Sequence, residues 1–301
     1  MQKGAEGTPV QSILSHRRGG RLYMPGILTD KDFSLYSSLI YEQSGIHFSE
    51  MNRSILDTRV QERLKITQHK DVTAYYHFIL RNSEEMKMLL DSVTTNLTRF
   101  FRNTGQFETL EHFVIPDLVA HKTKIKQPHL RVWSAGCATG EEPYSIAFVL
   151  RDKVPKNFTL EIIASDLSLK SLMTAQEGYY PENKTEGIPH HYLTTCFEKK
   201  QNGFQVKEDI KSLIKFDYHN LKFDSGLHNV DILFCRNVII YFDEAAQKAV
   251  INRFWKIMSP HSYLFLGHSE SLFGMNTSFE FVKTDWSIIY RKFTGSAEKK
   301  L

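Results

Sequence analysis

Two glycines and two acidic residues separate a predicted strand from a predicted helix in WSAGCATGEEPYS (Trp133–Ser145). Gly136 and Gly140 would let the backbone turn tightly and approach a ligand. Their spacing is GxxxG rather than GxGxxG, and Glu141 and Glu142 open the helix where a phosphate would need neutral donors. The pattern therefore favours a neutral or cationic ligand over a pyrophosphate. A plain strand–helix turn, with one acid stabilising the helix N-terminus, is the alternative.

Polar residues also follow two other predicted strands. Asp166 comes directly after LEIIAS, where a carboxylate can accept both ribose hydroxyls of an adenosine ligand. The alternative for Asp166 is an N-cap of the next helix. Arg236 and Asn237 follow VDILFC, although Asn237 could instead be a turn residue. Because ligands of open α/β sheets bind beyond the carboxyl ends of the strands, we expect these side chains to meet in one cleft.

A further polar segment, TTNLTRFFR (Thr94–Arg102), connects the two halves of the chain. Small hydroxyls, an amide and arginines at a domain junction suit a lid over a ligand. An ordinary capped linker is the alternative.

The elements that must position these residues change in type along the chain. Apolar residues recur at helical spacing without β-type alternation over residues 28–106, which predicts an all-helical domain. Over residues 107–301, short apolar runs alternate with helical stretches, which predicts an α/β domain with a mostly parallel sheet covered on both faces. FEFVK and WSIIYRKF predict an antiparallel hairpin at the sheet edge. Residues 178–220 predict a small inserted subdomain, and residues 1–27 a flexible basic arm.

The composition bounds the function. The 301 residues carry 38 Lys+Arg against 34 Asp+Glu, a formal net charge of +4, with 41% hydrophobic residues, as in an ordinary soluble chain of about two domains. No apolar run approaches the roughly 18–20 residues of a membrane helix, and the charge is too weak to indicate nucleic acid. The three cysteines form no CxxC pair, which argues against a disulfide framework or a zinc site. We expect a cytoplasmic protein without a metal, membrane insertion or a nucleic-acid partner.

Taken together, TTNLTRFFR, WSAGCATGEEPYSIA, ASDLS, FCRNVIIYFD and HSESLFG resemble the CheR-type chemotaxis receptor methyltransferases. The resemblance extends from about Leu28 to Phe293. It implies a Rossmann-like class I S-adenosylmethionine-dependent methyltransferase domain, a helical N-terminal domain and a small inserted β subdomain. It also implies methyl transfer from S-adenosylmethionine, leaving S-adenosylhomocysteine, to glutamate side chains of methyl-accepting chemotaxis receptors.

The resemblance implies roles for particular residues. Tyr241 would stand near the transferable methyl. Our own hypothesis is that Arg102 and Tyr241 are catalytic residues that position the glutamate carboxylate and the methyl group. A free glutamate, with a pKa of about 4.3, is ionised at neutral pH, so no strong general base is required. The implied cofactor contacts are Asn96, Thr98, Arg102, Gly136, Glu141, Asp166, Asn220, Leu221, Arg236 and Asn237.

The helical domain is expected to dock the acidic helical bundle of a receptor's cytoplasmic region. Arg53, Arg59 and Arg63 lie on its second predicted helix, and a basic stripe there could steer association; a solvated face is the alternative. The segment CFEKKQNGF (Cys196–Phe204) has one glycine where tethering members of the family carry a GxG loop. We therefore expect a monomer without a tether to a receptor pentapeptide.

Three other functions compete with this interpretation. A nicotinamide dehydrogenase is disfavoured by the missing GxGxxG and the paired acids. A nucleic-acid methyltransferase is disfavoured because neither NPPY nor a Pro-Cys nucleophile occurs. A non-catalytic cofactor-binding signalling module of the same family is harder to separate, although the intact motif set disfavours it.

Overall fold

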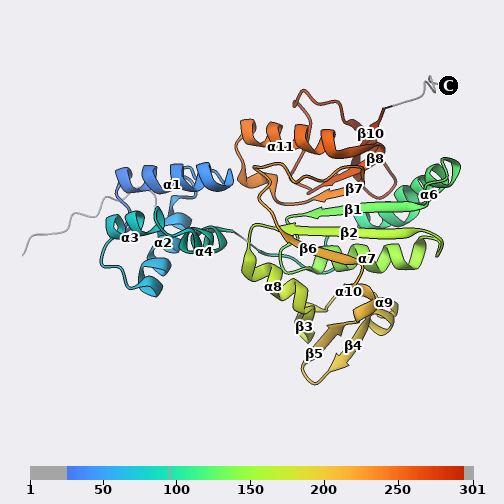
Figure 1. The fold of residues 1–301 in the computed structure, drawn as a ribbon, viewed down its shortest axis with the longest axis horizontal. Coiled ribbons are helices and arrows are strands. Elements are labelled where there is room, and N and C mark those ends of the chain that lie inside the picture. The colour runs from blue at the N-terminus through green and yellow to red at the C-terminus, as the bar shows by residue number, and fades with distance from the viewer. Residues whose placement is uncertain (1–25, 95, 295–301) are drawn as a thin grey trace, which may run out of the picture.

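The structure is a computed structural model that describes residues 26–94 and 96–294, so most of the predicted N-terminal arm lies outside the described residues. Figure 1 shows a small helical domain beside a larger domain built on a twisted sheet. Within the described residues, no helix has the length and apolar character needed to span a bilayer.

The helical domain consists of α1 (Asp30–Ser44), α2 (Arg53–Thr67), α3 (Val72–Ile79) and α4 (Ser83–Val93). Local sequence determines where these helices begin and end. Thr29 and Asp32 form a capping box at the start of α1, and Gly45 ends it with a φ of 79°. Asp71 and Asn82 cap α3 and α4 through their side chains.

The apolar faces of the four helices meet in one cluster that includes Tyr36, Leu56, Val60, Tyr75 and Leu89. A buried ion pair crosses this cluster. Arg63 Nη2 of α2 lies 2.7 Å from Glu85 Oε2 of α4, and the Tyr75 hydroxyl donates to Glu85 Oε1 at 2.7 Å. The group ties three helices together.

The second domain begins with α5 (Thr104–Thr109), which continues through a π-helical turn (Leu110–Val114) into α6 (Ile115–Lys124). Residues 96–102 before α5, the linking segment, pack with this domain, because Phe100 and Phe101 belong to the cluster that covers the sheet, whereas the helical cluster ends at Val93. The domain division predicted at residue 106 stays a prediction.

The sheet has seven strands in the order β6-β2-β1-β7-β8-β10-β9. Its parallel part comprises β1 (His129–Ala135), β2 (Thr159–Asp166), β6 (Ile214–Tyr218), β7 (Val230–Cys235) and β8 (Met258–Leu266). The predicted C-terminal hairpin is confirmed: β9 (Glu280–Lys283) and β10 (Ile288–Phe293) pair antiparallel, and β10 also pairs antiparallel with β8.

Both faces of the sheet are covered, as the unbroken apolar runs predict. Val132 and Phe234 point to the face that packs against α6 and α7 (Glu141–Lys153). Their neighbours Trp133 and Leu233 point to the other face and pack with Phe254 of α11 (Glu244–Ile257). Figure 1 shows α11 and α7 on opposite sides of the strands, with α8 (Leu169–Glu177) beyond β6.

The inserted subdomain is a three-stranded sheet, β3-β5-β4, that projects from the domain below α8 (Figure 1). It holds β3 (Tyr179–Pro181), a 3-10 turn (Glu182–Lys184), α9 (His190–Cys196), β4 (Phe197–Lys200), β5 (Gly203–Val206) and α10 (Glu208–Lys211). The structure differs from the predicted range 178–220 at its end, because Ile214–Tyr218 is β6 of the main sheet. This edge strand alternates apolar and charged residues, so its sequence resembles the polar insertion before it.

We expect Glu85→Ala to lower the free energy of unfolding of the helical domain by about 2–4 kcal/mol, because it leaves the largely buried charge of Arg63 without its partner. Glu84→Ala is the matched control: its side chain is exposed and pairs only with Lys87, so its loss should be below about 1 kcal/mol. Urea unfolding followed by circular dichroism measures both. Equal losses in the two variants would show that the Arg63–Glu85 pair contributes no more stability than the exposed Glu84–Lys87 pair.

Candidate functional site

A cavity opens at the carboxyl ends of β1, β2 and β7. Because β1 lies between β2 and β7, the strand order reverses at this point, which is where open α/β sheets bind ligands. Most of the predicted site residues line the cavity: Asn96, Thr98, Arg102, Gly136, Asp166, Asn220, Leu221, Arg236, Asn237 and Tyr241. Glu141 is not among the lining residues.

Gly136 must lack a side chain in the turn after β1. Its φ is +86°, and a Cβ there would stand 2.3 Å from Val238 Cγ2. The N–H groups of Gly136 and Cys137 both donate to the Ser165 carbonyl at the end of β2, at 2.8 and 3.0 Å. The bare backbone of this turn therefore forms part of the cavity wall.

The Asp166 carboxylate accepts backbone N–H groups from two turns, the one after β1 and the one before α8. Its Oδ2 accepts the Ala138 N–H and its Oδ1 accepts the Ser168 N–H, both at 2.8 Å. Ser168, not Asp166, is the N-cap of α8, which removes the N-cap alternative. Burial raises the pKa of Asp166, although the backbone N–H groups that it accepts act in the opposite direction.

Of the two adjacent acids, Glu142 lines the cavity and Glu141 does not, and the cofactor contact predicted for Glu141 stays a prediction. The Glu142 carboxylate lines the cavity, accepts the Ser134 hydroxyl at 2.7 Å and lies 3.2 Å from Arg236 Nη1. Glu141 is buried and accepts the Thr139 hydroxyl at 2.6 Å. Successive residues of a helix point about 100° apart, so α7 can direct only one of the two acids into the cavity. Burial raises the pKa of Glu142, and Arg236 partly offsets this.

Arg236 connects the end of β7 to the linking segment. It donates to the main-chain carbonyl of Arg102, and the Arg102 guanidinium in turn donates to the Leu97 carbonyl at 2.8 Å. The neighbouring Phe101 N–H donates to Ser145 Oγ of α7 at 3.0 Å. The segment with Asn96, Thr98 and Arg102 is thereby held against the cavity, as a lid position requires.

The helical domain closes one side of the cavity with Ser44 and Ile46, which sequence reasoning did not single out. The His47 N–H donates to the Tyr241 carbonyl at 2.8 Å. The ammonium of Lys222 contacts the carbonyls of Tyr41 and Glu42 at the end of α1. No local signal marks Ser44 or Ile46, because their role depends on how the two domains meet.

Asn220 and His219 lie on this same side. The Asn220 amide donates to the Gln43 carbonyl at 2.7 Å, so part of its hydrogen-bonding capacity holds the domains together. His219 lines the cavity without having been predicted, and burial lowers its pKa. Its position beside Asn220 on the chain after β6 is the signal that could have found it.

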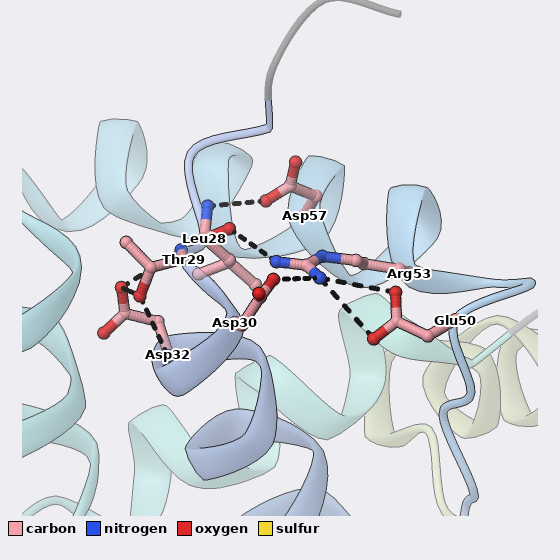
Figure 2. Close-up of polar contacts among 7 residues, drawn as sticks. All are labelled: Leu28, Thr29, Asp30, Asp32, Glu50, Arg53 and Asp57. Carbon is pink, nitrogen blue, oxygen red and sulfur yellow. Dashed lines mark hydrogen bonds and ion pairs between the residues drawn. The ribbon is translucent and has the colours of Figure 1, made fainter. Parts of the chain in front are cut away.

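The three arginines suggested for docking do not form a shared free face. Figure 2 shows Arg53 between Asp30 and Glu50, with its second guanidinium nitrogen donating to the Leu28 carbonyl at 2.9 Å. Arg63 is only partly exposed and pairs with the buried Glu85. Arg59 pairs with Glu62 of its own helix at 3.0 Å and keeps a more exposed side chain. Spacing on the helix placed these residues on α2 but could not show that two of them are held by acids from other segments.

The site fits a cationic nucleoside ligand. Two largely buried carboxylates, Glu142 and Asp166, line a cavity with apolar walls that include Leu97, Val238 and Phe242. The turn at Gly136 offers bare backbone. Among the described residues, no group of three or more His, Cys, Asp or Glu side chains is arranged to hold a metal ion.

Comparisons with known proteins agree with this geometry. The family described as "CheR methyltransferase, SAM binding domain" matches residues 96–288, and "CheR methyltransferase, all-alpha domain" matches residues 31–94. The chain is 34% identical to the chemotaxis protein methyltransferase of Borreliella burgdorferi, over 85% of this chain and 93% of that protein. It is 31% identical to chemotaxis protein methyltransferase 2 of Vibrio cholerae, over 89% and 93%. It is 32% identical to the chemotaxis protein methyltransferase of Escherichia coli, over 81% and 85%.

The two family matches together span both domains of the structure, and the cavity lies where the S-adenosylmethionine-binding match and the helical match adjoin. The chain belongs to the CheR methyltransferase family, with S-adenosylmethionine as its cofactor.

Proposed function

We propose that this protein transfers a methyl group from S-adenosylmethionine to glutamate side chains of methyl-accepting chemotaxis receptors, forming glutamyl methyl esters. The observation that carries the proposal is the cavity itself, which gathers the predicted residues of both domains at the switch point of the sheet. The names of the curated relatives, chemotaxis protein methyltransferases, support the reaction class and the setting.

The residues present suit the cofactor. Asp166 stands at the end of β2, where its carboxylate can accept ribose hydroxyls while it keeps its backbone contacts. Glu142 offers the charge that a cationic amino or sulfonium group requires. When bound, S-adenosylmethionine supplies a methyl group made electrophilic by its positive sulfur. Asn220 and Leu221 would border the adenine, and Arg236 and Asn237 the methionine part.

The acceptor needs alignment more than activation. A glutamate carboxylate is already the nucleophile at neutral pH, so the protein does not have to remove a proton. Orientation of reacting groups can contribute roughly 7–11 kcal/mol. Charge is neutralised as the ester forms, so the apolar walls that exclude water also help.

Arg102 and Tyr241 are the residues that we propose position the acceptor. Both line the cavity, and they come from the two segments that enclose it, the linking segment and the loop after β7. The Arg102 main chain is held by Arg236, and the Tyr241 main chain by the His47 N–H of the helical domain. The backbone positions of both residues are therefore set by contacts within the chain.

We further propose that the helical domain docks the receptor, with Arg59 as the arginine of α2 that remains available. The short turn between β4 and β5, at Gln201 and Asn202, supports the expectation of no pentapeptide tether.

The three cysteines are free and buried, as suits a protein of the cytoplasm. We retain the expectation of a monomer.

We expect Glu142→Gln to weaken S-adenosylhomocysteine binding about tenfold, because the variant loses the charge that faces the amino group. Glu141→Gln is the matched control on the adjacent residue, and its buried contact with Thr139 should keep affinity within about threefold of wild type. Titration calorimetry measures both. A larger loss in the Glu141 variant would show that Glu141, rather than Glu142, contacts the cofactor.

We expect methyl-labelled S-adenosylmethionine and a receptor cytoplasmic fragment to yield labelled protein that releases volatile methanol in base. Base lability follows from an ester linkage. Arg102→Ala and Tyr241→Phe should lower turnover at least about tenfold with cofactor still bound, since alignment of the acceptor is lost.

Base-stable label would identify another acceptor residue. Cofactor binding without any label transfer, across several receptor fragments, would instead favour the non-catalytic signalling module.

We expect Arg59→Glu to raise the KM for the receptor fragment about fivefold, equivalent to about 1 kcal/mol, and to weaken the salt dependence of KM. Arg81→Glu, an exposed arginine outside α2, changes the net charge equally and serves as the control. Initial rates at several salt concentrations make the comparison. Identical effects of the two variants would point to net charge rather than to docking on α2.

A further inference from the structure

A buried carboxylate, Glu270, lies just beyond the end of β8 and accepts four backbone N–H groups. Its Oε2 accepts the N–H of Gly267 at 2.6 Å and of Asn237 at 2.7 Å. Its Oε1 accepts the N–H of Val238 at 2.8 Å and of Ile240 at 3.3 Å. Only 8% of the residue is exposed. Three of the four donors belong to the loop that follows β7.

That loop carries Arg236, Asn237 and Tyr241 into the cavity. Its backbone leaves the sheet at Cys235, and Asn237 adopts a left-handed φ of 59°. N–H groups that leave a strand ladder inside a protein must find other acceptors. Glu270 provides acceptors for Asn237 and Val238, and also for Ile240 within the 3-10 turn at Ile239–Tyr241.

Gly267 allows this close approach. A Cβ at that position would stand 2.5 Å from Glu270 Oε2 and 2.8 Å from the Asn237 nitrogen. The segment beyond Glu270 is held as well, because the Leu272 N–H donates to the Tyr290 hydroxyl of β10 at 3.0 Å. The segment that carries Glu270 is thus fixed against β10. Its carboxylate in turn holds the loop that follows the adjacent strand β7.

We infer that Glu270 is a positioning residue, which sets the place of Asn237 and Tyr241 in the cavity by accepting the N–H groups of their loop. Glu270 itself does not line the cavity, so it acts through the loop rather than on a ligand. The inference rests on the proposed function only for its effect on turnover. Its effect on the loop and on cofactor binding is independent of the acceptor.

The test compares Glu270→Gln with Asp231→Asn. Asp231 is a fully buried carboxylate at the opposite end of β7, where it accepts the Arg131 N–H and the Ser259 hydroxyl and pairs with Lys122. Both variants remove one buried charge and should lower the melting temperature. Only Glu270→Gln puts an amide N–H against loop donors near the cavity.

Three measurements are made on the full chain. In Glu270→Gln, amide hydrogen exchange in residues 236–242 should quicken at least about tenfold, and the Kd for S-adenosylhomocysteine should rise at least about fivefold. The kcat for receptor methylation should also fall at least about tenfold, with a smaller change in the KM for the receptor fragment. Asp231→Asn should leave all three within about twofold of wild type.

Wild-type exchange and affinity in a folded Glu270→Gln would overturn the inference, as would equal changes in Asp231→Asn. If Glu270→Gln does not fold, Gly267→Ala keeps the carboxylate but displaces it from the loop, and it should reproduce the faster exchange and weaker affinity. Unchanged exchange in Gly267→Ala would also overturn it. If wild type methylates no receptor, the proposed function fails, while exchange and cofactor affinity still decide the role of Glu270.

Discussion

The site depends on buried carboxylates that hold backbone N–H groups where parallel strands end. At that edge the chain leaves the sheet, and its N–H groups lose their ladder partners while still enclosed by protein. Asp166 accepts the N–H groups of Ala138 and Ser168, and Glu270 accepts those of the loop after β7. These intrachain contacts set the course of the backbone around the cavity.

The cavity also depends on the contact between the two domains. Lys222 of the sheet domain meets the carbonyls at the end of α1, where a cation is favoured by the helix dipole. The isolated bridge between Ile46 and Phe242 and the bond from His47 to the Tyr241 carbonyl lie beside the same opening. Since Ser44 and Ile46 line the cavity, the orientation of the helical domain bears directly on the shape of the cofactor site. The helical domain is thus connected to the loop after β7 through the backbone of Tyr241.

The positions of the charged residues are more informative than the net charge of the chain. Arg63 lies in the core of the helical domain, Arg53 joins the start of α1 to α2, and Arg236 lies beneath the linking segment. These arginines hold segments together, so a count of basic residues on a predicted helix overstates the surface available to a partner. The cavity holds carboxylates and guanidinium groups together: Glu142 is paired with Arg236, while Asp166, among the described residues, accepts only backbone N–H groups.

Local sequence patterns were enough to predict the element types, the mostly parallel sheet with its C-terminal hairpin and the motifs of the site. Apolar periodicity, caps and glycine turns are local properties of the chain, and residues such as Asp166 and Asn237 reach the cavity because their strands end there. That Glu142 and not Glu141 lines the cavity could be seen only in the folded protein, because it depends on the rotation of α7 against the sheet. Only the tertiary structure assigned β6 to the main sheet, paired Arg63 with Glu85 and brought Glu270 onto the loop after β7. Each of these outcomes joins residues far apart in the chain, and such pairings follow from packing rather than from any local pattern.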